Sequence, residues 1–140
     1  AELYRKLRRK GYTEEACAVA TAYVQERGYQ DDLRYAEAWA RSALRTGKSR
    51  AALRAGLAER GVRLEIADAA IDAIERDDPD CFVRAIRKTA SRILRRNGYE
   101  SDDVDISFSL RDLTDNVRKS LISRLLRRGF SMTEIQKNFR

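Results

Sequence analysis

One compound pattern occurs three times in this chain of 140 residues. Two leucines stand four residues apart, a glycine follows the second leucine by four residues, and an apolar residue comes directly after the glycine. Leucines at this spacing lie on one face of a helix, and glycine readily adopts the left-handed conformation that ends a helix. A basic residue precedes each glycine and suits the negative end of the helix dipole. The pattern predicts three equivalent helices, closed by turns at Gly11, Gly61 and Gly129.

The three copies belong to a longer repeat. Gly61 follows Gly11 by 50 residues, and residues 33–45 recur at the same offset as residues 83–95. A period in this range is typical of stacked helical units. Gly129 follows Gly61 by 68 residues, so the third unit carries an insertion of about 18 residues. The matched positions are Leu33 and Val83, Ala36 and Ile86, Ala40 and Ala90, Ala43 and Ile93, Leu44 and Leu94, Arg34 and Arg84, and Arg45 and Arg95.

The repeat predicts an all-α protein, built as an elongated, curved tandem array of three-helix repeats. A single proline and seven glycines agree with helices throughout. Three units are expected: residues 1–28, which hold only the last two helices of a unit, residues 29–78, and residues 79–140, with an acidic insertion at about 98–116. The expected helices are 2–10, 13–27, 32–46, 49–60, 64–76, 79–97, 115–128 and 133 to the end.

Several of these helices have recognisable start signals. Asp31 or Asp32 is expected to cap the helix that follows, because a short carboxylate accepts hydrogen bonds from unpaired backbone N–H groups. Pro79 fits the first turn of a helix, where its missing N–H is not needed. Ser131 and Glu134 have the spacing of a capping box that opens the last helix.

The insertion differs in composition from its surroundings. It holds six acidic residues against one base, Arg111, and its residues from Val104 to Leu110 alternate between apolar and polar. Without a second strand, this alternation does not predict a stable sheet. We expect either an ordered loop whose apolar side chains pack inward or a mobile acidic flap. The alternative to a functional role is a passive connector.

The charge of the chain indicates an anionic partner, such as nucleic acid or an acidic protein groove. The net charge is +7 and the sequence pI is about 9.7. The basic residues of segment 82–97 have no local acid, and like charges four apart destabilise a helix, so an anion is expected there. A solvated basic face is the alternative. The predicted partner-binding residues are Arg34, Arg41, Arg45, Arg84, Lys88, Arg92, Arg95, Arg124, Arg127 and Arg128.

Catalytic chemistry has little support in the sequence. The chain has no histidine, the commonest general base and metal ligand, and no glycine-rich phosphate loop. The acidic row from Glu65 to Glu75 has helical spacing and is interpreted as a solvated face. We therefore expect a protein that is not an enzyme and that has no metal or cofactor.

The remaining composition favours a soluble, intracellular protein. No apolar run approaches the roughly 20 residues of a membrane span. Cys17 and Cys81 are far apart and fit small core residues in a reducing cytoplasm. Tyr35 and Trp39 are expected to pack inside or between units rather than to stack on bases. Tyr29 and Tyr99 each follow a glycine and are expected to be partly exposed.

The motifs of the central unit resemble those of the RecX family. The matching residues are Gly28, Tyr29, Asp31, Asp32, Arg34, Tyr35, Ala36, Gly47, Leu53, Leu57, Arg60, Gly61, Val62 and Ile66. The motifs of the outer units are weaker alone but strong in this order. They are Leu3, Tyr4, Lys6, Leu7, Lys10, Gly11 and Tyr12 at the start and Leu125, Arg128, Gly129, Phe130 and Ile135 at the end. The resemblance covers nearly the whole chain except the insertion.

The resemblance implies three tandem three-helix repeats and a bacterial cytoplasmic regulator of the RecA recombinase. Such a protein would bind the RecA–DNA filament along its groove and restrain strand exchange, ATP hydrolysis and co-protease activity. Its partners would be the RecA filament and, with weak to moderate affinity, single- or double-stranded DNA. We expect the protein to be a monomer that does not bind a membrane. Two features depart from the family pattern: the first unit lacks its opening helix, and the acidic insertion replaces a short connection. The alternative function is that of a self-sufficient basic helical nucleic-acid-binding protein.

Overall fold

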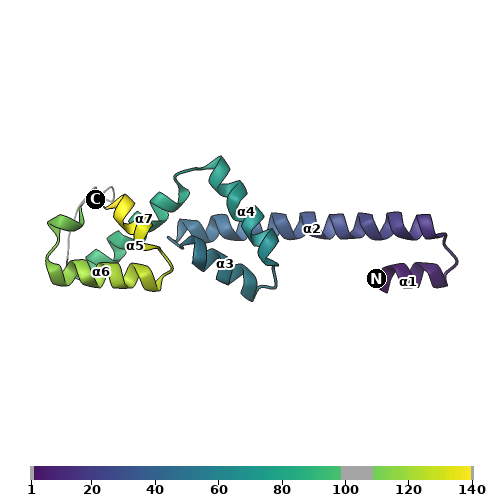
Figure 1. Ribbon diagram of the computed structural model, residues 1–140, viewed down its shortest axis with the longest axis horizontal. Helices are drawn as coiled ribbons and strands as arrows, with labels where there is room; N and C mark the ends of the chain where they lie inside the picture. The colour runs from purple at the N-terminus through teal and green to yellow at the C-terminus, as the bar shows by residue number, and fades with distance from the viewer. Residues whose placement is uncertain (1, 99–108, 140) are drawn as a thin grey trace.

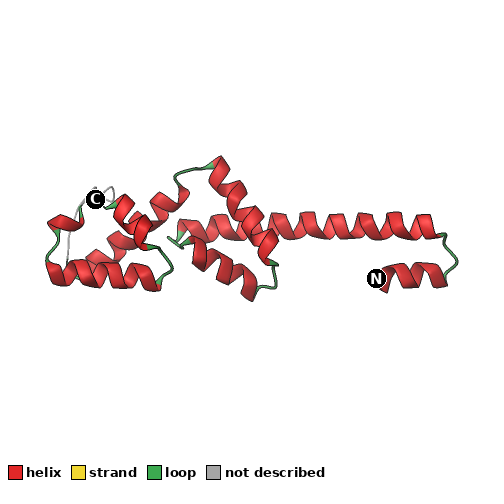
Figure 2. Ribbon diagram, viewed as in Figure 1, coloured by secondary structure: helices red, strands yellow, loops and turns green. Residues whose placement is uncertain are grey.

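The computed structural model describes residues 2–98 and 109–139. Within these ranges the chain is all-α, as predicted, and contains no strand (Figure 2). The elements are α1 (Glu2–Arg9), α2 (Glu14–Arg45), α3 (Arg50–Glu59), α4 (Leu64–Asp77), α5 (Cys81–Arg96), the short 3-10 helix η1 (Leu110–Asp112), α6 (Asp115–Arg127) and α7 (Met132–Asn138).

The helices form an elongated array (Figure 1). At one end α1 lies beside the N-terminal half of α2, apart from α3 and α4. The C-terminal half of α2 packs with α3 and α4 in the middle of the molecule, and α5, α6 and α7 pack together at the other end. The long helix α2 therefore connects the first group of helices to the second.

The three glycine turns share one geometry, as the repeated pattern predicted. Gly11, Gly61 and Gly129 have φ values of 94°, 78° and 95°, the left-handed region that glycine adopts without strain. In each turn the amide after the glycine donates to the carbonyl of the second leucine, which closes the helix end. The donor and acceptor pairs are Tyr12 N and Leu7 O at 3.2 Å, Val62 N and Leu57 O at 3.0 Å, and Phe130 N and Leu125 O at 3.2 Å.

Positions related by the 50-residue offset are buried alike. The matched residues of α2 and α5 are buried at four of the five apolar pairs, and the pair Leu33 and Val83 is half-buried in both helices. Each segment faces its own core: the α2 segment packs on α3 and α4, and the α5 segment packs on α6 and α7. Leu57 and Leu125, the second leucines of the glycine pattern, are fully buried in these two cores.

The helix break predicted near Gly28 is wrong. Helix α2 runs without interruption for 32 residues, so Asp31 and Asp32 lie inside it as exposed side chains and cap nothing. A glycine inside a helix costs only about 1 kcal/mol relative to alanine, and a break would leave backbone hydrogen bonds unmade. Residues 22–32 are all exposed, so this part of α2 is a bare helical rod.

Two other start signals behave differently from the prediction. Helix α5 begins at Cys81, and Pro79 precedes it in a turn rather than occupying its first turn. Ser131 caps α7 by accepting a hydrogen bond from the Glu134 amide at 3.1 Å, which is one half of the predicted capping box. Ser49 caps α3 in the same way, through the Ala52 amide at 3.1 Å.

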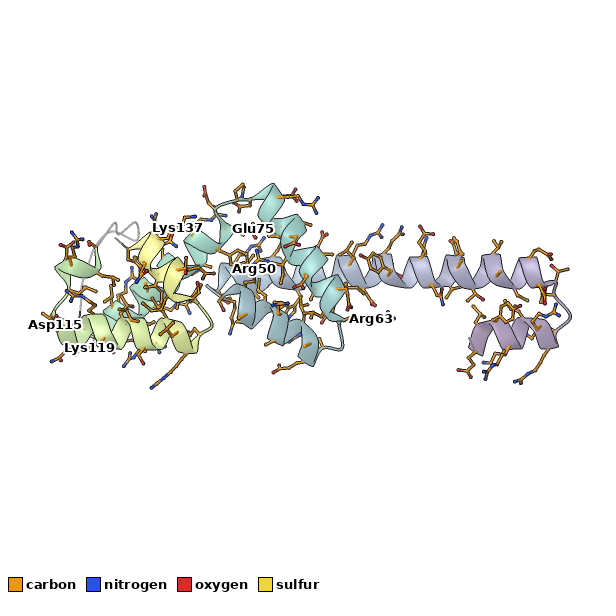
Figure 3. All side chains as sticks on the ribbon, viewed as in Figure 1. Arg50, Arg63, Glu75, Asp115, Lys119 and Lys137 are labelled. Carbon is orange, nitrogen blue, oxygen red and sulfur yellow. The ribbon has the colours of Figure 1, made fainter. Side chains whose placement is uncertain are left out.

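The acidic row on α4 is a partly solvated face, as predicted, and three of its four acids also form ion pairs. Asp68 lies 2.9 Å from Arg54 of α3. Arg50 of α3 forms ion pairs with both Asp72 and Glu75, and Figure 3 shows Arg50 and Glu75 on neighbouring helices. These carboxylates therefore join α3 to α4, which explains their helical spacing.

The aromatic predictions are confirmed in part. Trp39 is half-buried between the two clusters of the central core, and the Arg60 guanidinium lies 4.6 Å from the centre of its ring. Tyr35, in contrast, is exposed, because the packed face of α2 is carried by its alanines. Tyr29 is exposed as expected, whereas Tyr99 lies outside the described residues. Cys17 and Cys81 are buried free thiols, as predicted.

Most of the acidic insertion lies outside the described residues. Its described end forms η1 and then Leu113, which is buried in the core of α5, α6 and α7. Arg118 of α6 fixes this end by donating to the carbonyls of Leu110 at 2.7 Å and Leu113 at 3.0 Å. Over the part of the chain that the structure describes, no helix combines the length and apolarity that crossing a membrane requires.

Candidate anion-binding interface

Three side chains on one face of α5 hold the C-terminal end of α2. Lys88 donates to the Arg45 carbonyl, Arg92 donates to the Thr46 carbonyl, and the buried Thr89 hydroxyl donates to the Gly47 carbonyl at 2.7 Å. The last carbonyls of a helix have no partner within it and carry partial negative charge. Lys88 and Arg92 therefore pair with the carbonyls and the partial negative charge at the end of α2.

The prediction that the basic row of α5 has no local acid is wrong at its first member. Arg84 forms an ion pair with Asp78, and this hydrogen bond raises the pKa of the Arg84 guanidinium. Arg41 of α2 forms an ion pair with Asp77 at 3.0 Å. Two acids at the end of α4 therefore form ion pairs with two of the predicted cations. Both pairs are largely exposed, and solvent weakens such interactions.

Four of the predicted residues line one groove between α2 and α5. This α2–α5 groove has a volume of about 560 Å³ and is partly apolar. It also contains the Asp78 carboxylate, so its charge is mixed. Its lining residues are Arg41, Leu44, Arg45, Ile74, Asp78, Cys81, Arg84 and Lys88.

Three more of the predicted residues line a second groove, whose lining includes the turn that connects α2 to α3. This α3–α6 groove has a volume of about 490 Å³. Its charged lining residues are all basic, and its other residues are small. The lining residues are Thr46, Gly47, Lys48, Ser49, Ala51, Ala52, Ala55, Arg92, Arg127, Arg128 and Gly129.

The remaining predicted residues, Arg34, Arg95 and Arg124, are exposed and line neither groove. The sequence prediction also missed Lys48, which lies in the α3–α6 groove. Lys48 stands between a glycine and a serine in a short turn, outside every helical row. A signal was nevertheless present, because a cation beside a helix-capping serine lies at the positive end of a helix, where anions bind.

The α3–α6 groove lies where the start of α3 meets the end of α6. The Ser49 hydroxyl, at the start of α3, donates to the Arg128 carbonyl at the end of α6 with a distance of 2.6 Å. Gly129 allows this approach, since a Cβ atom at that position would lie 2.6 Å from the Ser49 oxygen. Ser49 is only 1% exposed, so the joint is closed to water at this point.

The two grooves differ in the chemistry that they offer. The α3–α6 groove holds only cations and small polar or apolar groups, so it can bind anionic groups by charge-assisted hydrogen bonds, for which arginine is well suited. In the α2–α5 groove the cations share the lining with the Asp78 carboxylate. Among residues 2–98 and 109–139, no group of three or more cysteines and carboxylates is placed to hold a metal ion.

Comparison with known proteins identifies relatives of the whole chain. The model of the second three-helix domain of RecX matches residues 31–71. Regulatory protein RecX of Mycolicibacterium vanbaalenii is 31% identical over 95% of this chain and 68% of its own length. Regulatory protein RecX of Stenotrophomonas maltophilia strain K279a is 32% identical over 97% of this chain and 73% of its own length.

The comparison with solved structures gives no match. The family relationship rests instead on sequence, and it agrees with the fold, since residues 31–71 run from the C-terminal half of α2 through α3 into α4. These helices form the central core. The chain belongs to the RecX family of regulatory proteins.

Proposed function

We propose that this protein modulates the RecA recombinase by binding the RecA–DNA filament along its groove and restraining recombination, ATP hydrolysis and co-protease activity. The observation that carries the proposal is family membership, because the relatives are named regulatory proteins and the central family domain is matched. We also propose that the protein is a cytoplasmic monomer that binds no cofactor and catalyses no reaction.

The shape of the molecule supports binding to a polymer. A helix of 32 residues is about 48 Å long, and α2 links helices at the two ends of the array. An elongated protein can contact several neighbouring subunits of a filament, so modest contacts at separate points combine into strong binding. The cationic residues of the central and C-terminal groups supply such contacts to acidic protein surface and phosphate.

The direct test is the rate of ATP hydrolysis by RecA on single-stranded DNA, measured while this protein is titrated in. We expect the rate to fall at protein concentrations near that of RecA. An unchanged rate, together with unchanged filament growth, would reject the proposal.

A pair of variants tests which surface contacts the filament. Arg34→Glu with Arg45→Glu reverses two exposed cations of α2, whose side chains form no ion pair in the described part of the chain. Arg63→Glu with Lys119→Glu is the matched control, with the same change in charge at two exposed positions outside α2 (Figure 3). We expect the first pair to weaken inhibition of RecA about tenfold more than the control. Equal effects would remove α2 from the interface.

The alternative function, a self-sufficient nucleic-acid-binding protein, is favoured by the net charge of +7 and by the all-basic α3–α6 groove. It predicts tight binding to naked DNA. Weak binding to naked DNA beside strong binding to the RecA filament would favour the first proposal.

A further inference from the structure

We propose that the α3–α6 groove binds the phosphodiester backbone of a nucleic acid without regard to sequence, and that the α2–α5 groove does not. This assigns the nucleic-acid contact of the proposed function to one groove and rests on that function for its biological setting. The binding itself is a property of this chain and is measured without RecA.

The charge of the α3–α6 groove fits a polyanion. Four cations, Lys48, Arg92, Arg127 and Arg128, line it, and no carboxylate is among its lining residues. For Lys48, Arg127 and Arg128 the described part of the chain shows no ion pair. Arg92 donates one N–H to the Thr46 carbonyl, and a guanidinium has five N–H donors. Cations that are unpaired inside the protein are available to an external anion.

The uncharged lining distinguishes phosphate from an acidic protein partner. Apart from the cations, the groove is lined by glycine, alanine, serine and threonine. Protein interfaces depend on large apolar or aromatic anchors in fitted pockets, and this groove offers none. Small side chains instead let a strand approach the backbone closely. The absence of a lining aromatic removes base stacking, so recognition is limited to the phosphates and is independent of sequence.

The α2–α5 groove has the opposite character. Arg84 is paired with Asp78 inside it, and Arg41 is paired with Asp77. Leu44 and Ile74 give it an apolar floor. A phosphate entering this groove would have to compete with carboxylates already in place, so the two grooves have separate roles.

The groove is assembled from two repeat units. Lys48 comes from the turn after α2, Arg92 from α5, and Arg127 and Arg128 from the end of α6. The hydrogen bond from Ser49 to Arg128 draws the α6 end against the start of α3. The four cations converge only when these units are docked, so the site is a product of the repeat packing rather than of any single helix.

The test is binding of the full chain to fluorescein-labelled oligonucleotides, single-stranded and duplex, followed by anisotropy at several salt concentrations. The groove variant is Lys48→Gln with Arg127→Gln, which leaves the structural contact of Arg92 in place. The control, Arg63→Gln with Lys119→Gln, removes the same charge from two positions that do not line the groove, the residue before α4 and the N-terminal half of α6 (Figure 3). Circular dichroism confirms that each variant is folded.

We expect the groove variant to bind single-stranded DNA at least tenfold more weakly at low salt, and the control less than threefold. The slope of log K against log salt concentration should fall by about 1.4 for single strands in the groove variant, because two phosphate contacts are lost. Wild-type binding should not depend on sequence. Equal losses in the two variants, no binding by the wild type, or displacement of the oligonucleotide by poly-glutamate or a mononucleotide at equal charge would overturn the proposal.

The failures of the two proposals are distinguishable. If the wild type binds DNA through the groove but leaves RecA activity unchanged, the groove assignment stands and the RecA proposal fails. If RecA is inhibited but the groove variant binds DNA like the control, the groove assignment fails and the RecA proposal stands.

Discussion

Ser49 performs two tasks with one hydroxyl group. It accepts a hydrogen bond from the Ala52 amide, which caps α3, and it donates to the Arg128 carbonyl of α6. Both groups are screened from water because Ser49 is buried. Residues with two such roles link the stability of an element to the docking of its neighbour.

Replacing Ser49 with alanine should therefore cost more than the loss of an ordinary helix cap. Loss of a cap typically costs about 1 kcal/mol, and loss of the second hydrogen bond, from buried Ser49 to the Arg128 carbonyl, adds about 1 kcal/mol. Ser131→Ala removes a cap at an exposed position and is the control. Urea denaturation should show the larger loss of unfolding free energy for Ser49→Ala. A loss no greater than that of Ser131→Ala would mean that the inter-unit bond adds nothing.

Cys81 gives the protein a specific dependence on alkaline pH. Burial of the thiol, and next the negative charge of Asp78, raise its pKa above the ordinary value of 9.0. Between that value and the raised one, the unfolded thiol has lost its proton while the folded thiol keeps it. Folding is then opposed as pH rises, so the stabilising effect is complete below about pH 9 and is lost above it.

In the variant Cys81→Ser, the side chain at position 81 has no thiol that could lose a proton in this pH range. We expect the unfolding free energy of the wild type to fall more steeply as the pH rises above 9.0 than that of Cys81→Ser, after each is referred to its own value at pH 7. Urea denaturation followed by circular dichroism gives both curves. Parallel curves would show that the thiol environment in solution is not the buried one seen here.

At the scale of the helix, two glycines with the same surroundings have opposite roles. No atom lies within 4 Å of a Cβ atom added at Gly28 or at Gly61, so a side chain at either position meets no steric clash with its neighbours. Gly28 lies inside α2 with ordinary helical geometry, whereas Gly61 has a φ of +78° in the turn after α3. The backbone angle is the remaining difference.

Alanine should therefore stabilise one site and destabilise the other. Gly28→Ala should stabilise the exposed part of α2 locally by about 0.5–1 kcal/mol, because alanine loses less entropy in a helix. Gly61→Ala should lower the stability of the central core by about 1–2 kcal/mol, the cost of placing a Cβ atom in the left-handed region. Amide hydrogen exchange of residues 22–32 measures the first effect, and urea denaturation followed by Trp39 fluorescence measures the second. A loss of stability in Gly28→Ala would indicate that α2 is broken at that residue in solution.

These elements also show what could be predicted from the sequence. The three glycine turns were predicted correctly because their signals are local, and the hydrogen bonds span only five residues. The buried positions of α2 and α5 were predicted because their spacing follows the helical period. The continuity of α2 was not predicted, because a single glycine changes the free energy of a continuous helix relative to a broken one by only about 1 kcal/mol.

The grooves could not be predicted because they depend on contacts between distant residues. The bonds that set their geometry join Lys88 to Arg45 and Ser49 to Arg128, which are 43 and 79 residues apart. Periodicity correctly placed the basic side chains on the surface of each helix. Periodicity gave no information on which helix ends would face these basic side chains. The sequence analysis therefore missed Lys48 and the backbone carbonyls at the end of α2 that accept hydrogen bonds from α5.

At the scale of the molecule, α2 determines the distance between the first helices and the rest. Its residues 22–32 are exposed, and α1 lies beside the N-terminal half of α2, apart from the central helices (Figure 1). A compact protein of this length would have a radius of gyration of about 14 Å. Small-angle X-ray scattering should give a value well above this, and the value should not change with protein concentration if the protein is a monomer.

The variant Gly28→Pro separates the rod from the cores. Proline inside a helix removes a hydrogen bond and kinks the helix, at a cost of about 3 kcal/mol. Because residues 22–32 contact no core, this cost should remain local: the scattering profile should change, while the urea transition reported by Trp39, the single tryptophan, should shift by less than about 0.5 kcal/mol. A compact wild-type profile, or a Trp39 transition lost in Gly28→Pro, would show that the first helices fold against the central unit. The reach of α2 could then not explain binding along a filament.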